Sequence, residues 1–196
     1  MKNKKEFFEL DYNVQFTVDS KSQIIVASDV CQDRTDTHQL QPQINNVREN
    51  VKLKEDTKIA ADCNYNAGGN LKFLEESFID GYIPTLSQAQ ELDEREKTVK
   101  EDEYTYDWEK DEIIWKGARL KYVGTWNQGK KCRQRIYRSE DGKIMKKVME
   151  FFRERLRMKN KMETEEGKRI YNLRKIVVEP VIVHQFNLSV FLLVDY

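Results

Sequence analysis

The sequence KIAADCNYNAGGNL, from Lys58 to Leu71, joins a short apolar run to a loop through a single carboxylate. Ile59, Ala60 and Ala61 are small apolar residues of the kind found in a strand covered on both faces, and the Asn and Gly residues that follow favour a loop and a helix start. Asp62 therefore stands at the carboxyl end of a strand, where open α/β sheets bind ligands. Two interpretations remain open: a metal ligand, or an aspartate that only caps the next helix.

The elements on either side of this stretch predict a mixed sheet flanked by helices. Alternating residues over 12–19 and β-branched residues over 23–30 predict a β-hairpin. Apolar residues at helical spacing over 40–51 predict an amphipathic helix, with Asp36 and Gln39 placed like a capping box at its start. After the strand over 57–62 come an expected short helix over 71–78 and a brief strand over 81–84. Strands that alternate with helices indicate the α/β class.

The second half of the chain predicts an inserted lobe between two parts of the core. We expect the first part of the core over 1–86, an acidic linker with a basic β/α lobe over 87–160, a core helix over 161–182 and an atypical apolar tail over 183–196. Within the lobe we expect a hairpin over 104–115, a strand over 120–126 and a helix over 143–160. Thr164 is placed as the N-cap of the last helix, because Glu165 and Glu166 follow it.

The composition is that of a polar protein with no membrane span. Charged residues make up 35% of the 196, the mean hydropathy is −0.80, and no apolar run approaches the roughly 20 residues that a span requires. The first residues have no apolar segment like that of a signal peptide, so we expect a cytoplasmic location. Cys31, Cys63 and Cys132 lie far apart and never form a C-x-x-C pair, which supports neither a disulfide framework nor a zinc site.

A formal net charge of zero conceals a strong polarity along the chain. The segment from Lys116 to Lys175 contains 20 Lys and Arg but 7 Asp and Glu. Clustered cations of this kind favour a polyanion partner, because they release counterions when they neutralise phosphates. Aromatic residues interleaved with them can stack on bases; alternatively, the charges form a solvated helix face and the aromatics form the core of a small lobe. The candidate DNA contacts within the lobe are Lys130, Lys131, Arg133 and Arg135.

Three blocks of the sequence resemble a known family. They are YNVQFTVD (12–19), ADCNY (61–65) followed by GNL (69–71), and RKIVVEPV (174–181). In this order, with an acidic-to-basic insertion between the second and third, they resemble the core blocks of DDE transposases from bacterial insertion sequences. The resemblance implies a ribonuclease-H-like catalytic domain with an inserted lobe, which uses two aspartates and a glutamate to hold divalent metal ions for DNA transposition.

The resemblance also implies roles for individual residues. Asp62 matches the family's second catalytic aspartate and Glu179 its glutamate, so both are candidate catalytic residues and ligands of Mg²⁺ or Mn²⁺. Such a pair of ions, roughly 3.5–4 Å apart, activates the attacking oxygen and stabilises the leaving oxygen of a phosphodiester. Tyr171 and Arg174 match a tyrosine and an arginine that position DNA near the cut, and Lys175 beside them is a further candidate DNA contact. The implied DNA is the terminal repeats of the insertion sequence.

The chain also departs from the family's pattern. The first catalytic aspartate of the family lies on a strand before the hairpin, and no matching strand precedes residue 12 here. Asp19, Asp29 and Asp36 occupy positions typical of turns and caps, which makes them poor substitutes. We therefore expect a sheet that lacks an internal strand and exposes an edge, and a transposase fragment truncated at both ends that is inactive and binds metal weakly at best. The alternatives are a DNA-binding or regulatory remnant, which pairs with itself or with an intact transposase, and an orphan protein with no DNA role.

Overall fold

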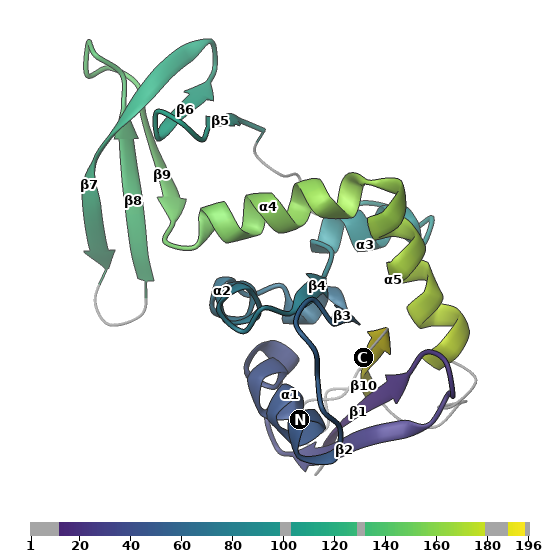
Figure 1. Cartoon of the computed structure of the whole chain (residues 1–196). Coiled ribbons are helices and arrows are strands. Elements are labelled where there is room, and N and C mark those ends of the chain that lie inside the picture. The colour runs from purple at the N-terminus through teal and green to yellow at the C-terminus, as the bar shows by residue number, and fades with distance from the viewer. Residues whose placement is uncertain (1–11, 99–102, 129–131, 179–187, 195–196) are drawn as a thin grey trace, which may run out of the picture. The chain divides into compact units, whose positions relative to one another are not determined.

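A computed structural model describes residues 12–98, 103–128, 132–178 and 188–194. The chain divides into two compact units. The first comprises Met1–Lys97 together with Glu154–Tyr196, and the second comprises Thr98–Arg153. Figure 1 labels the helices and strands of both units.

The first unit is built on a mixed five-stranded sheet with the order β2-β1-β10-β3-β4. The strands are β1 (Asn13–Asp19), β2 (Ile25–Cys31), β3 (Lys58–Ala60), β4 (Asp80–Tyr82) and β10 (Leu188–Val194). β1 and β2 form the predicted antiparallel hairpin, and β3 pairs with β4 in parallel. The predicted α/β class with a mixed sheet is therefore confirmed.

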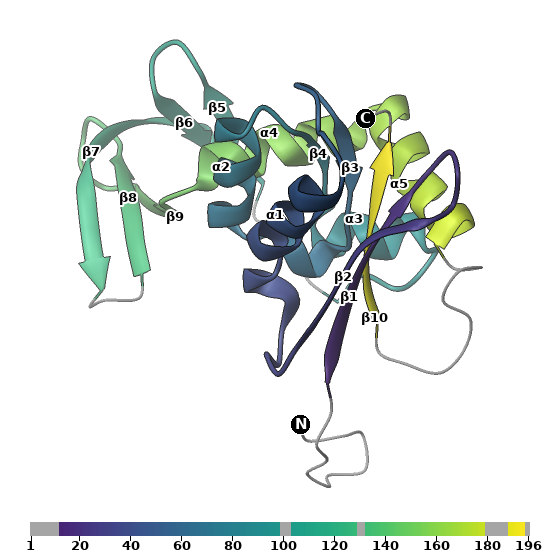
Figure 2. The same ribbon diagram turned by 60° about the horizontal axis from the view of Figure 1, so that its bottom comes forward.

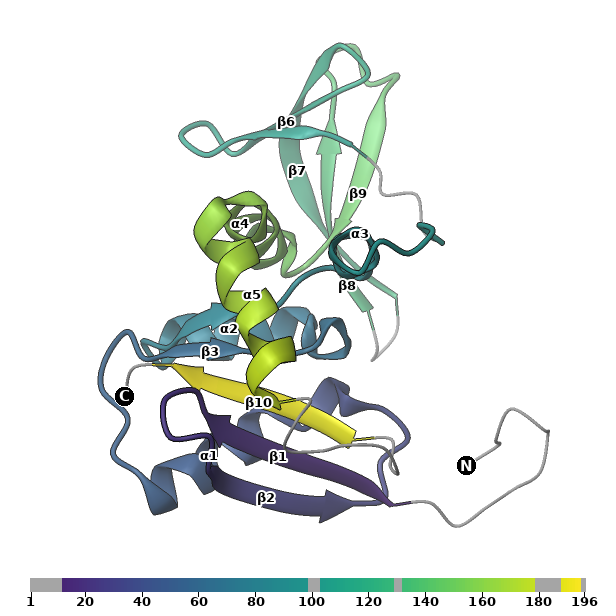
Figure 3. The same cartoon turned by 90° about the vertical axis from the view of Figure 1, so that its right-hand side faces the viewer.

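The strand β10 occupies the position between β1 and β3, and this corrects the expectation of an exposed internal edge. β10 pairs with β1 in parallel, from Val14 opposite Leu188 to Asp19 opposite Leu193. Its last three residues pair with β3 in the antiparallel direction. Figures 2 and 3 show β10, in yellow, between the two strands. The expectation failed because an apolar segment at the end of the chain gives no local sign of its partner strands, and its pairing with β1 and β3 completes the sheet.

Helices pack against this sheet, and the sequence periodicity predicted most of them. They are α1 (Leu40–Asn50), α2 (Gly68–Glu76), α3 (Leu86–Leu92), α4 (Phe152–Glu163) and α5 (Glu165–Val178), with the short 3₁₀ turns η1 (Asp36–His38) and η2 (Cys63–Tyr65). α1 contacts β1 and β2, and α5 contacts β10, β3 and β4. Thr164 caps α5 as predicted, because its hydroxyl accepts a hydrogen bond from the Gly167 N–H at 3.0 Å.

One helix, α3, lies within the stretch that we expected to be an acidic connector. Thr85 and Gln88 form a reciprocal capping box at its start, with the Gln88 N–H donating to the Thr85 hydroxyl and the Thr85 N–H donating to the Gln88 side chain. The expected capping box of Asp36 and Gln39 is wrong, because α1 begins without a side-chain cap. Asp36 is instead buried in a polar network.

The hydrophobic core of the first unit contains side chains from both its helices and its sheet. Its fully buried members include Leu40 and Ile44 of α1, Leu71 and Leu74 of α2, Ile170 and Tyr171 of α5, and Phe191, Leu192 and Leu193 of β10. The Phe191 ring lies 4.4 Å from the ring of Tyr65, centroid to centroid. The tail strand is thus a full member of the hydrophobic core.

The second unit is an antiparallel sheet with the strands in chain order, and it curls into half of a barrel. The strands are β5 (Thr105–Asp107), β6 (Glu112–Trp115), β7 (Ala118–Gln128), β8 (Cys132–Arg138) and β9 (Met145–Met149). The predicted hairpin over 104–115 and the strand over 120–126 are confirmed by β5, β6 and β7.

The predicted helix over 143–160 is wrong in its first part. Residues Met145–Met149 form β9, and helix begins only at Phe152. Ile144 and Val148 are spaced like residues on one helix face, but Lys146 and Val148 alternate as buried residues of a strand. The turn before β9 contains Gly142 in the left-handed region at φ 71°. This turn allows β9 to fold back on β8, and the pairing overrides the short helical pattern.

Among the described residues, no helix is both long enough and apolar enough to cross a bilayer.

Candidate functional site

Asp62 lies directly after β3 and begins the turn η2. Its backbone is extended, and its carboxylate accepts hydrogen bonds from the Asn64 N–H at 3.1 Å and from the Cys63 thiol at 3.2 Å. Asp62 therefore caps the turn, as the alternative interpretation of the sequence proposed. Both hydrogen bonds use the same carboxylate oxygen, Oδ1, so the cap leaves Oδ2 for a second contact.

The second oxygen of Asp62 faces a cation from α5. Arg174 Nη2 lies 3.5 Å from Asp62 Oδ2 and 3.4 Å from the hydroxyl oxygen of Tyr171. The Arg174 guanidinium also lies over the Tyr171 ring, 5.0 Å from its centroid. The Arg174 Nε is buried without a hydrogen-bond partner among the described residues. The fold thus brings together three of the predicted site residues, Asp62, Tyr171 and Arg174.

Burial and the Asp62 charge suppress ionisation of the two neutral groups beside it. Burial, reinforced by the adjacent Asp62 carboxylate, raises the pKa of the Cys63 thiol to about 12. Burial likewise raises the pKa of Tyr171 to about 12, although the positive charge of Arg174 opposes the change. Neither group is therefore a nucleophile or a base at neutral pH.

Lys175, the next candidate DNA contact on α5, forms an ion pair within the first unit. Its ammonium forms an ion pair with Asp93 and donates to the Leu92 carbonyl oxygen at 3.3 Å. Arg95 contacts the same carboxylate. Burial acts to raise the pKa of Asp93, but hydrogen bonds from Lys175 and Arg95 outweigh it and lower that pKa. Lys175 can reach a phosphate only by leaving this pair.

A buried polar network lies next to this cluster, and the sequence reasoning missed it. The Asp36 carboxylate accepts hydrogen bonds from the side-chain amides of Asn13 at 2.7 Å, Gln15 at 3.1 Å and Asn64 at 3.4 Å. The Tyr65 hydroxyl donates to the Gln15 side chain. The amide and hydroxyl residues of β1 were the only signal, since they alternate with apolar residues but face the protein interior.

The described residues do not assemble a set of ligands for the implied metal ions. Among them, no group of three His, Cys, Asp or Glu side chains could hold a metal ion. Asp62 faces a guanidinium, and the Asp36 carboxylate is surrounded by amides. Glu179, the predicted partner of Asp62, lies outside the described residues. The donors that are present therefore fit a salt-bridged core better than a two-metal centre.

In the second unit, the predicted DNA contact Arg135 forms an ion pair within the lobe. Arg135 and Arg153 both pair with the Asp111 carboxylate, at 2.5 and 2.8 Å. The hydroxyls of Tyr106 and Tyr137 donate to the same carboxylate at 2.8 and 2.6 Å. Burial acts to raise the pKa of Asp111, but these hydrogen bonds and the charge of Arg135 lower it overall. Arg135 is thus held inside the lobe by Asp111.

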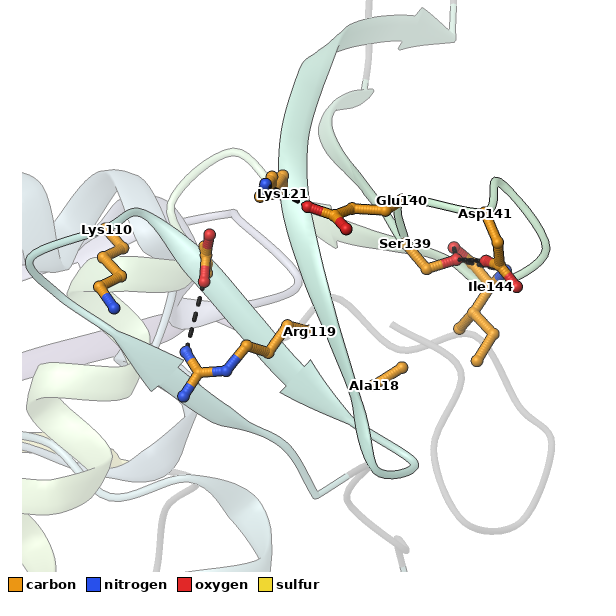
Figure 4. Close-up of a pocket in the computed structure, with 9 residues that line it drawn as sticks. Lys110, Ala118, Arg119, Lys121, Ser139, Glu140, Asp141 and Ile144 are labelled. Carbon is orange, nitrogen blue, oxygen red and sulfur yellow. Dashed lines mark hydrogen bonds and ion pairs between the residues drawn. The ribbon is translucent and has the colours of Figure 1, made fainter.

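Of the other three predicted lobe residues, the structure describes only Arg133. Arg133 lies exposed and pairs with Glu150 at 3.0 Å. Lys130 and Lys131 lie outside the described residues. A hollow of about 580 Å³ on the second unit mixes both signs of charge, with Lys121 paired to Glu140 at 2.6 Å and Arg119 near Glu112 at 3.4 Å (Figure 4). This pairing leaves the hollow without a dominant charge.

The outer face of β7, β8 and β9 combines exposed aromatic, sulfur and cationic side chains. Cross-strand partners share a face of a sheet, and the face opposite the buried Tyr137 and Val148 is called the outer face here. Its rows, read from β7 to β9, are Trp126-Gln134-Met149, Gly124-Ile136-Lys147 and Lys121-Arg138-Met145. None of these nine residues is acidic. Three of the nine are cations, and of these Lys121 pairs with Glu140, whereas Arg138 and Lys147 form no ion pair among the described residues.

Comparisons with known proteins were made on the whole sequence and on the structure. No family model, curated protein or solved structure matches this chain. The assignment of a function therefore rests on the residues and contacts described above.

Proposed function

We propose that this chain derives from the catalytic domain of a DDE transposase, has a ribonuclease-H-like core, and does not itself cut DNA. The observation that carries this proposal is the meeting of Asp62 with Tyr171 and Arg174. The resemblance assigns these residues to two distant blocks of the sequence, with the lobe between them. Their proximity is what a common ancestral site requires, because residues that position DNA must lie beside the metal ligands.

Loss of DNA cleavage follows from the surroundings of Asp62. The place beside β1, where a further core strand would carry a carboxylate, is taken by β10, whose sequence LSVFLLV contains no acidic residue. The partner of Asp62 among the described residues is a cation. Two-metal hydrolysis and strand transfer, the reactions of intact relatives, require several fixed carboxylates around Mg²⁺ or Mn²⁺.

The test is nicking of a supercoiled plasmid that carries the terminal repeats of the element, in Mg²⁺ or Mn²⁺. We expect the wild-type protein to nick no faster than the matched variant Asp62→Asn, which keeps the cap but removes the charge. Metal-dependent nicking that is lost in both Asp62→Asn and Glu179→Gln would overturn the proposed inactivity.

A second candidate function is binding of DNA without cleavage, which is favoured by the outer face. Two of its cations, Arg138 and Lys147, form no ion pair among the described residues, whereas Lys121 pairs with Glu140 and lies opposite Glu112 of β6. A remnant of this kind would occupy the terminal repeats, alone or together with an intact transposase. Affinity for duplex DNA should then fall steeply with salt, because each phosphate contact releases counterions.

The salt dependence also identifies the residues that carry this binding. Arg138→Gln and Lys147→Gln should each reduce the slope of log K against log salt by about 1. Lys110→Gln, an exposed change outside the outer face, should leave the slope unchanged. A slope near zero for the wild-type protein would exclude phosphate contacts, and with them this candidate function.

A further inference from the structure

The outer face has the chemistry of a stacking surface for unpaired bases, and we infer that it binds single-stranded DNA with Trp126 as its stacking residue. This inference rests on the proposed DNA-binding function and names the form of DNA and the surface involved. The surface consists of the three rows that begin at Trp126, Gly124 and Lys121 on β7.

The first step is that large apolar side chains on this face are exposed. Trp126 is 40% exposed, Met145 42% and Met149 48%, on a sheet whose other face buries Tyr137 completely. A sheet needs only one covered face to be stable, so its outer face would normally be polar. Apolar groups grouped on such a face indicate a surface that contacts a partner.

The second step is that the aromatic residue is combined with cations that form no ion pair among the described residues. The Lys147 ammonium lies over the Trp126 ring, 4.2 Å from its centroid, and the Arg138 guanidinium reaches the Met145 sulfur at 3.7 Å. Neither contact neutralises the charge, because the ring and the thioether carry none. Both cations therefore remain available to a phosphate, whereas Arg133 and Arg135 are each paired with a carboxylate.

The third step is the choice of ligand. A base can stack on the Trp126 ring while Lys147 moves to the adjacent phosphate, and this exchange requires a base that is not paired and stacked in a duplex. An acidic peptide would satisfy the cations but would gain little from the indole. The side-chain rows are spaced roughly 6.6–6.8 Å apart along the strands, so successive rows can meet successive parts of one extended strand.

The experiment compares the full-length protein and its variants on fluorescein-labelled oligothymidylate of about 12 nucleotides, a length within the range that a single β-barrel module covers. Trp126→Ala should weaken binding at least about tenfold, as expected for the loss of one stacked base. Trp108→Ala is the matched control, because Trp108 is 46% exposed on the same unit but does not belong to the outer face. Trp126→Phe should restore part of the affinity.

The outcomes separate this inference from the proposed function. Equal affinity of wild-type protein and Trp126→Ala for oligothymidylate, with the circular dichroism of both unchanged, would overturn the inference. If duplex DNA still binds with a steep salt dependence in that case, the DNA-binding function stands alone. Binding to neither form of DNA would overturn both. Tighter binding to polyglutamate than to oligothymidylate would assign the face to an acidic protein instead.

Discussion

At the scale of single residues, the Asp62 carboxylate interacts with three neighbouring groups. It caps η2, accepts a hydrogen bond from Cys63 and faces Arg174. The sequence placed it correctly at the end of a strand, and left both a cap and a metal ligand open. Its cation partner could not be foreseen from spacing, because Arg174 lies on a helix far away in the chain.

The Cys63 thiol provides a direct probe of the Asp62 charge. Burial and Asp62 hold the pKa of Cys63 at about 12, so alkylation by iodoacetamide at pH 8 should be slow and should accelerate about tenfold per pH unit. Asp62→Asn keeps the cap and removes the charge, so Cys63 should react several-fold faster in this variant. Mass spectrometry of the peptide that contains Cys63, with the Cys31 peptide as internal reference, measures the rate. An unchanged rate would show that Asp62 does not act on the thiol.

Asp111 should link the stability of the second unit to pH. Its folded-state pKa lies below the unfolded value of about 3.9. Its stabilising contribution is therefore complete above about pH 4 and is lost as the pH falls through the folded pKa. Asp111→Asn should cost about 2–4 kcal/mol at pH 7, since Arg135 and Arg153 lose their counter-charge.

The Asp111 effect is measured by urea unfolding of wild type and variant between pH 3 and pH 7. The two curves should converge at the acid end. Glu109→Gln, an exposed change in the same turn, is the control and should unfold like the wild type. A constant difference between Asp111→Asn and wild type over the whole pH range would contradict the linkage.

At the scale of elements, hydrophobic periodicity predicted the hairpin, three of the core helices and most of the short strands. It failed at β9, where a strand pairs with β8 despite a helical spacing of apolar residues. It also treated the whole acidic stretch after residue 86 as a connector, although α3 begins there with a complete capping box. Both failures have one cause: short segments take their structure from neighbours that the local pattern does not contain.

The outer edge of β2 shows how the chain protects a strand that has no further partner among the described strands. The Asn50 side-chain amide donates to the Val26 carbonyl oxygen at 2.8 Å, and the Asp29 carboxylate accepts from the Val30 N–H at 2.8 Å. An irregularity in the register between β1 and β2 adds to this protection. These features disfavour pairing of the edge with another chain.

The turn between α4 and α5 depends on the absence of a side chain at Gly167. A Cβ atom there would lie 2.9 Å from Met162 Cα and still closer to the Lys161 carbonyl oxygen, both of which are backbone atoms. Gly167→Ala should therefore cost about 2–3 kcal/mol in the free energy of unfolding. Gly69→Ala in α2 is the matched control, because a Cβ there meets nothing within 4 Å and should stabilise by up to about 1 kcal/mol. Equal effects in thermal unfolding would contradict this account.

At the scale of the whole molecule, β10 decides whether the strands of the first unit form one sheet or two separate pairs, β1 with β2 and β3 with β4. β1 and β3 are joined only through β10 in the strand order. Leu192 is fully buried in that strand. Leu192→Asp places a charge in the core, so we expect it to abolish cooperative unfolding of the first unit, since an unpaired buried charge costs more than the stability of most small domains.

Hydrogen exchange tests this role and the independence of the units together. In Leu192→Asp, amides of β1 and β3 should lose protection, whereas amides of β7 and β8 should keep it, because the second unit has its own core around Tyr137. Val30→Asp on the exposed side of β2 is the control and should leave both patterns intact. Retained protection of β1 and β3 in Leu192→Asp would show that the tail strand is dispensable.

By itself, the sequence determined the class of the fold, the hairpin, three of the core helices, the capping of α5 and the place of Asp62, because periodicity and capping are local properties of the chain. Only the tertiary structure decided three things: that the apolar tail becomes the central strand, that Arg174 neutralises Asp62, and that Arg135 is held in the lobe while Trp126 and Lys147 are exposed together. Each depends on which distant segments share a sheet face or a core, and the hydrophobic and electrostatic energies that select those neighbours arise from contacts between segments far apart in the sequence.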